Sequence, residues 1–515
     1  MMFVRFDLLV AALSLLHVHT WLTMPVLADL GFPPWLRAAH WINVFFIGYL
    51  MRSGIQILSS YPRLYWNDHT TPGTEWIKFT KNDPPKDKLW ITLDQEVPVS
   101  PLIAQPGGKQ LGLGRHWHFF SIIFWLLNGL VYVVLLFATG EWRRLIPTSW
   151  SIIPDAWHTF LTYATFHLPP DSAFHPYDPL QQLAYAAVVF LLGPFLILTG
   201  AAQSPALEAQ FPWYVRLFGG RQFARSLHFL GLLAFIAFTI VHTALVIITG
   251  LGRNLGDIVL GQHQHDQGLA IILGILIVAC ILALYGITSW LSQRFPRAIT
   301  HALAAIYGPF VRMMTLRSRS RQEYRPEDIS PVFPVNGEPP TDPDYLKLLW
   351  EDFAGYHLEI TGLVKHPLCL SLAEIKALPK QTQITKHDCI QGWSAIGEWG
   401  GVSLGQLLER CEPLPEARYL VFWSYSDDTS GRPFYETINL ALARHPQTIL
   451  AYEMNGQPVP MPHGAPLRLR VETQLGFKMV KWIRRIEVVE RYDAIREGEG
   501  GSREDNKHYE QAAAI

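Results

Sequence analysis

Cysteine is scarce in this sequence of 515 residues, which contains only four, and no two of them form a CxxC pair. The sequence therefore gives no sign of a disulfide framework, and it offers no cysteine pattern for an iron–sulfur cluster or a zinc site. Charged residues are also scarce, at 17% of the chain, and the formal net charge is -1. This balance gives no reason to expect a nucleic-acid partner. The cysteines are Cys280, Cys369, Cys389 and Cys411.

Apolar residues, by contrast, make up 49% of the chain, and their excess lies in the first 300 residues. This region contains six runs with few or no charges, each long enough to cross a bilayer as a helix. The first run could be a cleaved signal peptide, which would leave five spans. It has no small-x-small cleavage site before Asp29 and no twin-arginine pair, so we expect a retained helix. The runs cover residues 8–27, 38–58, 117–138, 181–201, 226–249 and 269–291.

Two histidines, His228 and His242, lie in the fifth run and are fourteen residues apart. On an α-helix this spacing is about 21 Å of rise and close to four whole turns, so both lie on nearly one face. A single histidine here could simply be packed against a neighbouring helix, but imidazoles inside a membrane are costly and are usually functional. Two at this spacing indicate axial ligands of two stacked haems.

The arrangement Arg-x-x-His-aromatic occurs at three of the runs and places a guanidinium one helical turn from an imidazole. Such an arginine could pair with a haem propionate while its histidine binds iron. The alternative is that these arginines only extend toward the membrane surface. We prefer the haem interpretation because the arrangement occurs three times. The pairs are Arg37 with His40, Arg115 with His118, and Arg225 with His228.

The alternating directions of the spans then pair the ligands. His118 and His228 fall at one membrane face, and His40 and His242 fall at the other, which predicts two bis-histidine haems. His116 is not selected, because it lies about 200° from His118 around a helix. The other membrane-region histidines lack such a partner and are expected to be interfacial or structural: His17, His19, His158, His167, His175 and His301.

His263 and His265 lie together in the loop Gly-Gln-His-Gln-His-Asp. They could bind a metal or a quinone headgroup, but we favour a solvated loop.

The segments HWINVFFIGYLMRSGIQIL, GRHWHFF, NGLVY and LFGGRQFARSLHF resemble the di-haem b-type cytochrome subunits of bacterial formate dehydrogenases, hydrogenases and thiosulfate reductases. The resemblance covers residues 36–291, and the four selected histidines fall where that family has its haem ligands. It implies that this region carries electrons between a quinone and the redox centre of a partner.

Residues 292–345 form a connector, in which a basic run is followed by a proline-rich sequence that predicts an extended linker. The 59–115 loop, the 202–225 loop and the connector contain seven, three and seven Lys and Arg residues. The alternate loops contain one, two and one. The positive-inside rule therefore predicts that both termini, and the domain after the connector, face the cytoplasm at a bacterial inner (plasma) membrane. The periplasmic face is the alternative.

From residue 346 to 492 the runs YHLEITGLV, YLVFWSY, PLRLRVE and WIRRIEVVE read as strands, while SLAEIKALP and VSLGQLLERC read as short helices. Glycine and proline turns separate them, as in a soluble α+β domain. The predicted fold is therefore an all-α transmembrane bundle in residues 1–291 followed by this domain. Residues 493–515 are charged and glycine-rich, which predicts a disordered tail.

Cys389 lies in the run Thr-Lys-His-Asp-Cys-Ile-Gln-Gly-Trp of the soluble domain. A free cysteine is usually a small buried apolar side chain. This one follows Lys386, His387 and Asp388, a setting that can stabilise a thiolate as a metal ligand. The spacing alone leaves both interpretations open.

The segments HDCIQGWSAIGEWGGVSLGQLL and LAYEMNGQPVPMPHGAPLRLRVETQLGFKMVKWIRRIEV resemble the molybdopterin-binding domain of the sulfite oxidase and protein-methionine-sulfoxide reductase superfamily. The resemblance implies that Cys389 binds molybdenum. It also implies cofactor contacts, for which the alternative is a solvated strand face. The arginine-rich run that follows the cysteine in sulfite oxidases is absent, so a sulfite-binding arginine cluster is not implied. The predicted cofactor contacts are His387, His463, Arg468, Lys478 and Lys481.

Together the two resemblances imply a molybdopterin-dependent oxidoreductase that exchanges electrons between the quinone pool, two b haems and molybdenum. The molybdenum centre would transfer an oxygen atom to or from a small substrate, and the protein would position the cofactors. We favour sulfoxide-type reduction, with sulfite-type oxidation as the next alternative. A hypothesis from another class is an electron-transfer subunit whose soluble part is a non-catalytic docking domain for a separate enzyme.

Overall fold

The computed structural model describes residues 32–81, 83, 89–169, 177–261, 266–315 and 324–510. The predicted span at residues 8–27, together with His17, His19, His175, His263 and His265, lies outside them. The chain divides into two compact units, which we describe separately. The helical unit comprises Met1–Gly48, Ser121–Ile197 and Leu230–Tyr285, and the mixed unit comprises Tyr49–Phe120, Leu198–Phe229 and Gly286–Ile515.

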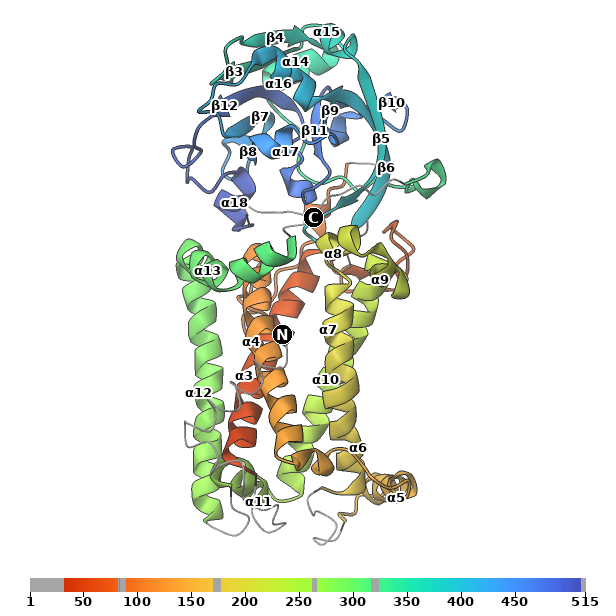
Figure 1. The fold of residues 1–515 in the computed structure, drawn as a ribbon, viewed down its shortest axis with the longest axis vertical. Helices are drawn as coiled ribbons and strands as arrows, with labels where there is room; N and C mark the ends of the chain where they lie inside the picture. The colour runs from red at the N-terminus through yellow and green to blue at the C-terminus, as the bar shows by residue number, and fades with distance from the viewer. Residues whose placement is uncertain are drawn as a thin grey trace, which may run out of the picture. The chain divides into compact units, whose positions relative to one another are not determined.

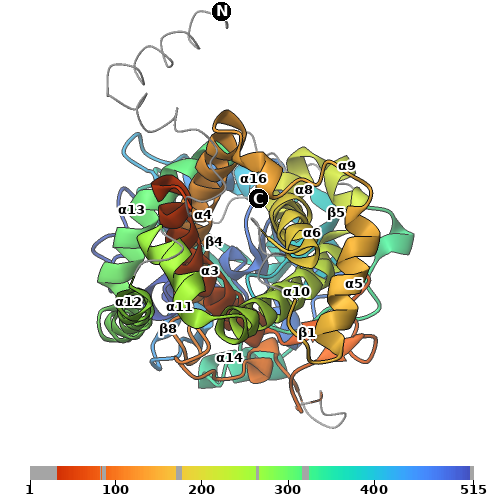
Figure 2. The ribbon, with the colours of Figure 1, turned by 90° about the horizontal axis from the view of Figure 1, so that it is seen from below.

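Five helical segments among the described residues are long and apolar enough to cross a membrane, and Figure 2 looks approximately along several of them. They confirm the last five of the six predicted runs. Side chains such as Leu130 and Leu282 are more than 60% exposed, which suits contact with lipid tails rather than water. The segments are α3 (Pro34–Ser60), α4 (Leu111–Ala138), α6 to α7 with η4 between them (Pro179–Ala201), α10 (Arg221–Ile248) and α12 (Gln267–Arg294).

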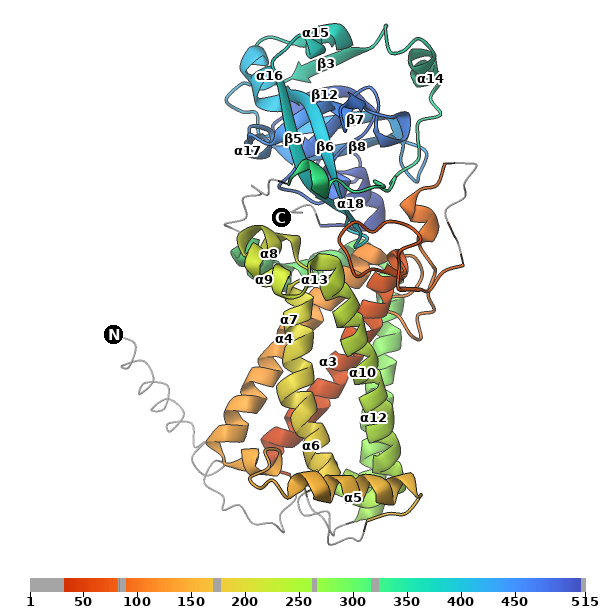
Figure 3. The same cartoon turned by 90° about the vertical axis from the view of Figure 1, so that its right-hand side faces the viewer.

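In the helical unit, α5 (Ile152–Ala164) lies across α6 (Pro179–Ala187), as Figure 3 shows. Its Trp157 and Phe160 are exposed, in the manner of aromatic residues at a membrane interface. The start of α3 is tied to the turn η5 (Gly256–Leu260), because Arg37 donates to the carbonyl oxygen of Val259 at 2.7 Å. Shorter elements of this unit are η2 (Glu141–Arg144), η4 (Val188–Leu192) and α11 (Leu251–Leu255).

Within the predicted connector, Pro296–Thr315 of the basic run forms the helix α13, which the sequence analysis did not predict. Leu303 and Tyr307 are buried one turn apart on one face, so tertiary packing outweighs the internal Pro309. Other elements of the mixed unit outside its soluble domain are β1 (Arg63–Leu64), β2 (Ile77–Lys78), η1 (Thr92–Gln95), α8 (Pro205–Gln210), α9 (Pro212–Leu217) and η6 (Pro326–Asp328).

The soluble domain contains two five-stranded sheets, visible in Figure 1. One has the order β4-β3-β12-β7-β8, and the other has β10-β9-β6-β5 with β11 also paired to β9. The strands are β3 (His357–Gly362), β4 (Leu368–Ser371), β5 (Lys380–Asp388), β6 (Ser394–Ser403), β7 (Tyr419–Asp427), β8 (Pro433–Asn439), β9 (Thr448–Met454), β10 (Gln457–Pro458), β11 (Arg468–Val471) and β12 (Ile483–Val489). The helical turns are α14 (Pro343–Trp350), α15 (Leu372–Lys376), α16 (Leu404–Cys411), α17 (Leu440–Ala443), η7 (Met461–His463) and η8 (Gly476–Lys478).

The core of this domain forms where alternate strand residues point inward. Leu358 and Ile360 of β3, Leu420 and Phe422 of β7, and Ile486 of β12 are all fully buried in one cluster. The four predicted strands and the two predicted short helices are confirmed as β3, β7, β11, β12, α15 and α16.

The prediction of a disordered tail is wrong for the described residues up to Glu510. Residues Ser502–Lys507 form the helix α18, and Gly501 bridges to Glu436. Lys478 donates to Glu436 at 2.7 Å and also pairs with Glu504 of α18. The tail is ordered because the Glu504 carboxylate pairs with the buried Lys478. The composition of the tail alone does not indicate this distant partner.

This ion-paired group gives a stability prediction. Replacing Lys478 with Met should destabilise the soluble domain by about 3–5 kcal/mol, because two carboxylates would stay buried without their cation. Thermal denaturation of the purified protein measures the change. The triple variant K478M/E436Q/E504Q should recover most of the loss. An unchanged melting temperature for K478M would contradict this assignment.

Candidate functional site

His40 of α3 and His242 of α10 face each other in the helical unit, with ring centroids 6.4 Å apart. Metal–imidazole bonds are about 2 Å long and each ring centre lies roughly 1 Å behind its nitrogen, so two imidazoles on one iron have centroids about 6 Å apart. Nδ1 of His242 is 3.2 Å from the Tyr185 hydroxyl, which leaves Nε2 for a metal. The geometry therefore fits one bis-histidine haem.

His118 of α4 and His228 of α10 lie together in the mixed unit, near enough to interact electrostatically. Nδ1 of His118 is 2.9 Å from the Ser53 hydroxyl, and Nδ1 of His228 is 3.1 Å from the Thr199 hydroxyl. A hydroxyl at Nδ1 orients each ring, as an outer hydrogen-bond partner does for a histidine that binds a metal. The structure thus brings the four histidines together in the two predicted pairs, while haem ligation itself stays a prediction.

Both ring nitrogens of His116, which was not predicted as a haem ligand, lie within hydrogen-bond distance of other groups. Its Nδ1 is 2.6 Å from the Tyr307 hydroxyl, and its Nε2 is 3.2 Å from the carbonyl oxygen of His508. His301 contacts Glu499, and within the described ranges no group of three or more His, Cys, Asp or Glu side chains could hold another metal ion.

The three arginines predicted to pair with haem propionates have different surroundings. Arg225 donates to the carbonyl oxygens of Tyr61 and Arg63, at 2.7 and 2.8 Å. Arg115 lies over the ring of Phe119, and Arg37 donates to backbone near η5. Propionate pairing stays a prediction for these arginines, and the Arg225 contacts indicate a further role in packing.

Cys389 occupies the turn between β5 and β6 and is 1% exposed. Asn336 donates its side-chain amide toward the sulfur at 3.6 Å. Burial raises the pKa of the Cys389 thiol to about 11. The thiol therefore loses its proton at neutral pH only when a cation binds the sulfur, as happens when a cysteine binds a metal ion.

Two cationic side chains, Arg468 and Lys481, lie near His387, and neither forms an ion pair within the described residues. Arg468 stacks on the Trp399 ring at 4.5 Å and donates to the His463 carbonyl oxygen at 2.8 Å, while its buried Nε has no hydrogen-bond partner in the described part of the chain. Lys481 donates to the carbonyl oxygen of Pro462 at 2.8 Å. Burial and neighbouring positive charge lower the pKa of both groups well below the usual range. Such a site needs an anion, and a pterin phosphate fits it.

Both predicted histidines lie next to these cations. Burial, with the charges of Arg468 and Lys481, lowers the pKa of His463 to about 3. Burial and the nearby Arg470 lower the pKa of His387 well below its usual value. His387 stacks on Trp393 with ring centroids 5.2 Å apart, so its ring is fixed beside the Cys389 turn.

Lys478 differs from Lys481 because Glu436 and Glu504 already neutralise its charge. We therefore propose Arg468 and Lys481 as the phosphate contacts and assign Lys478 to the ordered tail.

Sequence reasoning missed Asn336 in the proline-rich connector and Tyr509, which packs in the same apolar cluster as Cys389. No sequence motif marks either residue, because both are far from Cys389 in the sequence and approach it only in the folded chain.

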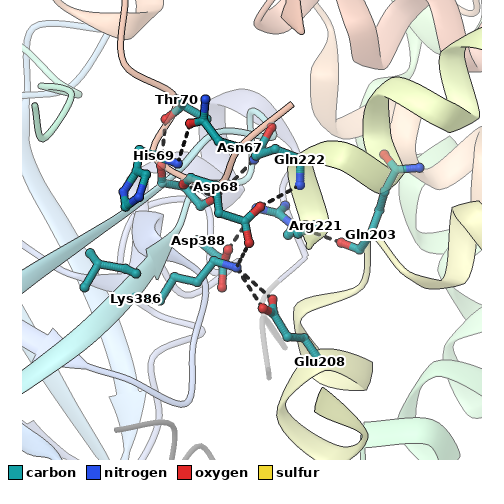
Figure 4. Close-up of polar contacts among 12 residues, drawn as sticks. Asn67, Asp68, His69, Thr70, Gln203, Glu208, Arg221, Gln222, Lys386 and Asp388 are labelled. Atoms are coloured by element: carbon teal, nitrogen blue, oxygen red, sulfur yellow. Dashed lines mark hydrogen bonds and ion pairs between the residues drawn. The ribbon is translucent and has the colours of Figure 1, made fainter. Parts of the chain in front are cut away.

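A cluster of buried charges surrounds the residues just before Cys389, as Figure 4 shows. Lys386 lies 2.8 Å from Glu208 and 3.3 Å from Asp68. Arg221, the first residue of α10, donates to Asp388 at 2.9 Å. Burial raises the pKa of Glu208, and burial alone would lower the pKa of Lys386, but the surrounding carboxylates raise it above the usual value. We call these five side chains the docking cluster.

Two family profiles match the chain. Residues 31–259 match prokaryotic cytochrome b561. Residues 347–494 match the oxidoreductase molybdopterin-binding domain. The chain joins a b561-type cytochrome to a molybdopterin-binding domain.

Several known proteins are similar to part of this fusion. A stretch of 141 residues is 39% identical to the putative protein-methionine-sulfoxide reductase subunit YedZ1 of Azospira oryzae, covering 27% of this chain and 52% of that protein. A stretch of 146 residues is 34% identical to the protein-methionine-sulfoxide reductase catalytic subunit MsrP of Xanthomonas campestris pv. campestris. It covers 26% of this chain and 45% of that protein. The chain spans about half the length of these curated relatives.

Among solved structures, the sulfane dehydrogenase SoxCD from Paracoccus pantotrophus is 26% identical with a TM-score of 0.24, over 27% of this chain and 39% of that one.

The histidine pairs predict separable haem losses. His242→Ala should remove the haem of the His40 pair, and His118→Ala should remove the haem of the His228 pair, because a single imidazole holds the iron weakly. Haem content and visible spectra of the purified variants measure this, with exposed His158→Ala of α5 as the control. Retention of both haems in either variant would refute the ligand assignment.

Proposed function

We propose that this protein is a membrane-bound molybdoenzyme that uses electrons from quinol to remove an oxygen atom from a sulfoxide-type substrate. The observation that carries the proposal is the buried Cys389 thiol two residues after His387, which lies near the cations Arg468 and Lys481. The same chain pairs His40 with His242 and His118 with His228. This combination suits a metal–pterin centre supplied with electrons by haems.

A bound molybdenum–pterin cofactor would supply the two-electron oxygen-transfer chemistry. Cys389 would bind the metal through its sulfur, and Arg468 and Lys481 would hold the anionic phosphate. The haems between His40 and His242 and between His118 and His228 would pass electrons singly. One quinol gives two electrons and two protons, and the sulfoxide becomes a sulfide while its oxygen leaves as water.

The names of the relatives favour the reductive direction, since both refer to protein-methionine-sulfoxide reductase. Sulfite-type oxidation, with electrons flowing to quinone, is the second candidate. It is supported by the cationic side chains Arg468 and Lys481, which would attract an anionic substrate.

Replacement of the cysteine tests the proposal. Cys389→Ser should abolish sulfoxide-dependent quinol oxidation because the molybdenum loses its protein thiolate, while both haem spectra stay intact. Cys411→Ser is the matched control, since Cys411 is buried in the core of the same domain. Undiminished turnover in Cys389→Ser, or a purified protein without molybdenum, would instead favour the docking-domain hypothesis.

The cytoplasmic location of the soluble domain is part of the proposal and follows from the positive-inside count. Glu338→Cys, placed at an exposed position in a background lacking the exposed Cys280 and Cys369, reports the side. In intact cells it should resist a membrane-impermeant maleimide and react after permeabilisation. Ready labelling in intact cells would place the domain in the periplasm.

A further inference from the structure

The turn that carries Cys389 is held by segments that precede the soluble domain in the chain. We propose that the first two turns of α10, which also carry His228, are the docking site that fixes this turn for electron transfer between haem and molybdenum. The inference rests on the proposed function, because it assumes that the protein binds both the His228 haem and the molybdenum cofactor. Its consequence is that the soluble domain stays docked throughout turnover.

The ion pair between Arg221 and Asp388 is the first contact. Arg221 donates one NH group to Asp388 at 2.9 Å and its Nε to the Gln203 carbonyl oxygen at 2.9 Å. Asp388 directly precedes Cys389. The two side chains are 9% and 6% exposed, so solvent screens the pair little and its directional bonds define one position.

The second contact is made by Gln222 and Arg225 with the glycine of the turn. Gln222 donates to the Gly392 carbonyl oxygen at 2.8 Å, and Arg225 would lie 3.2 Å from a Cβ on Gly392. Gly392 has φ +106 and donates its own N–H to the Cys389 carbonyl oxygen at 3.0 Å. A glycine is thus needed both for the turn and for the close approach of Arg225. His228 lies three residues after Arg225, on the same helix face.

The third contact joins Lys386 to Glu208 and Asp68 of the docking cluster, shown in Figure 4. Lys386 is three residues before Cys389 and donates to both carboxylate oxygens of Glu208, at 2.8 and 2.9 Å. It also donates to Asp68, which accepts from the backbone N–H of Gln222 at 2.8 Å. The Lys386 contact is therefore linked to the same turn of α10 as the ion pair.

Burial of these charges argues for a lasting contact. Transient redox complexes use small and weakly packed interfaces. Here the buried Arg221, Lys386 and Asp388 would have to be hydrated and buried again each time the domain left and returned, and their partly buried partners Glu208 and Asp68 would lose their ion pairs. Buried ion pairs add little net stability, but they are well suited to fixing one arrangement. Because electron transfer slows steeply with distance, a fixed arrangement keeps the His228 haem and the Cys389 metal close.

The test compares Arg221→Gln with Arg216→Gln in the full-length, cofactor-loaded protein. Arg216 is an exposed arginine on α9, so its replacement makes the same charge change away from the docking cluster. Three rates are measured anaerobically: haem reduction by menadiol, haem reoxidation by methionine sulfoxide, and sulfoxide reduction driven by reduced benzyl viologen, which can bypass the haems.

In Arg221→Gln we expect haem reduction and viologen-driven turnover to match wild type. Haem reoxidation by sulfoxide should slow roughly tenfold to hundredfold, as small misplacements of reacting groups do. Arg216→Gln should match wild type in all three rates. The inference is overturned if Arg221→Gln reoxidises its haems at the wild-type rate, or if viologen-driven turnover falls equally, which would assign Arg221 to the molybdenum site itself.

Amide hydrogen exchange provides a readout that does not depend on the substrate. Exchange in residues 389–393 and in the first turn of α10 should increase in Arg221→Gln and not in Arg216→Gln. Wild-type protein that shows no reaction with sulfoxide or sulfite contradicts the proposed function, while the exchange pattern still decides the docking. Unchanged exchange in Arg221→Gln overturns the inference.

Discussion

Burial of paired charges is the constraint on which the mixed unit depends. Lys386, Arg221 and Lys478 are each almost completely removed from solvent, and each is compensated by carboxylates from distant parts of the chain. None of these groups could be buried alone, because an unpaired charge inside a protein is strongly unfavourable. The loop after α3, the start of α10, the soluble domain and the tail must therefore assemble together.

The cationic group formed by Arg468 and Lys481 near His387 supports the proposed function. Arg468 is almost as deeply buried as Lys478, and Lys481 is partly buried, yet among the described residues neither forms an ion pair and both donate to backbone carbonyl oxygens. Unlike Lys386, Arg221 and Lys478, these two cations have no carboxylate partner among the described residues, which suits the binding of an anion. The paired imidazoles are also held in place, since Nδ1 of His242, of His118 and of His228 each lies within hydrogen-bond distance of a hydroxyl, as in histidines that bind a metal.

The sequence predicted the parts of this structure that depend on local pattern. Five membrane helices follow from the length of apolar runs, and the pairing of His40 with His242 and of His118 with His228 follows from helix direction and spacing. Strands with regular alternation, such as β3 and β12, were equally predictable. The assignment of Cys389 needed the family resemblance, because one cysteine among charged neighbours has several meanings.

The remaining features depend on partners that are distant in sequence. The polar strand β5 (Lys380–Asp388) shows no apolar alternation, because its last residues are buried through ion pairs rather than through apolar packing. Residues 497–510 have the composition of a disordered tail, and they are ordered by Lys478 and by the packing of Tyr509 on Phe477. Asn336 reaches the Cys389 sulfur from a proline-rich segment whose composition predicts only an extended connector.

A redox titration of the purified chain tests the central claim most directly, with haem absorbance and molybdenum(V) paramagnetic resonance followed in the same sample. The account predicts two b-haem transitions together with a molybdenum(V) signal at intermediate potentials, all from one polypeptide. A single haem transition, or the absence of any molybdenum signal in protein with full haem content, would contradict it.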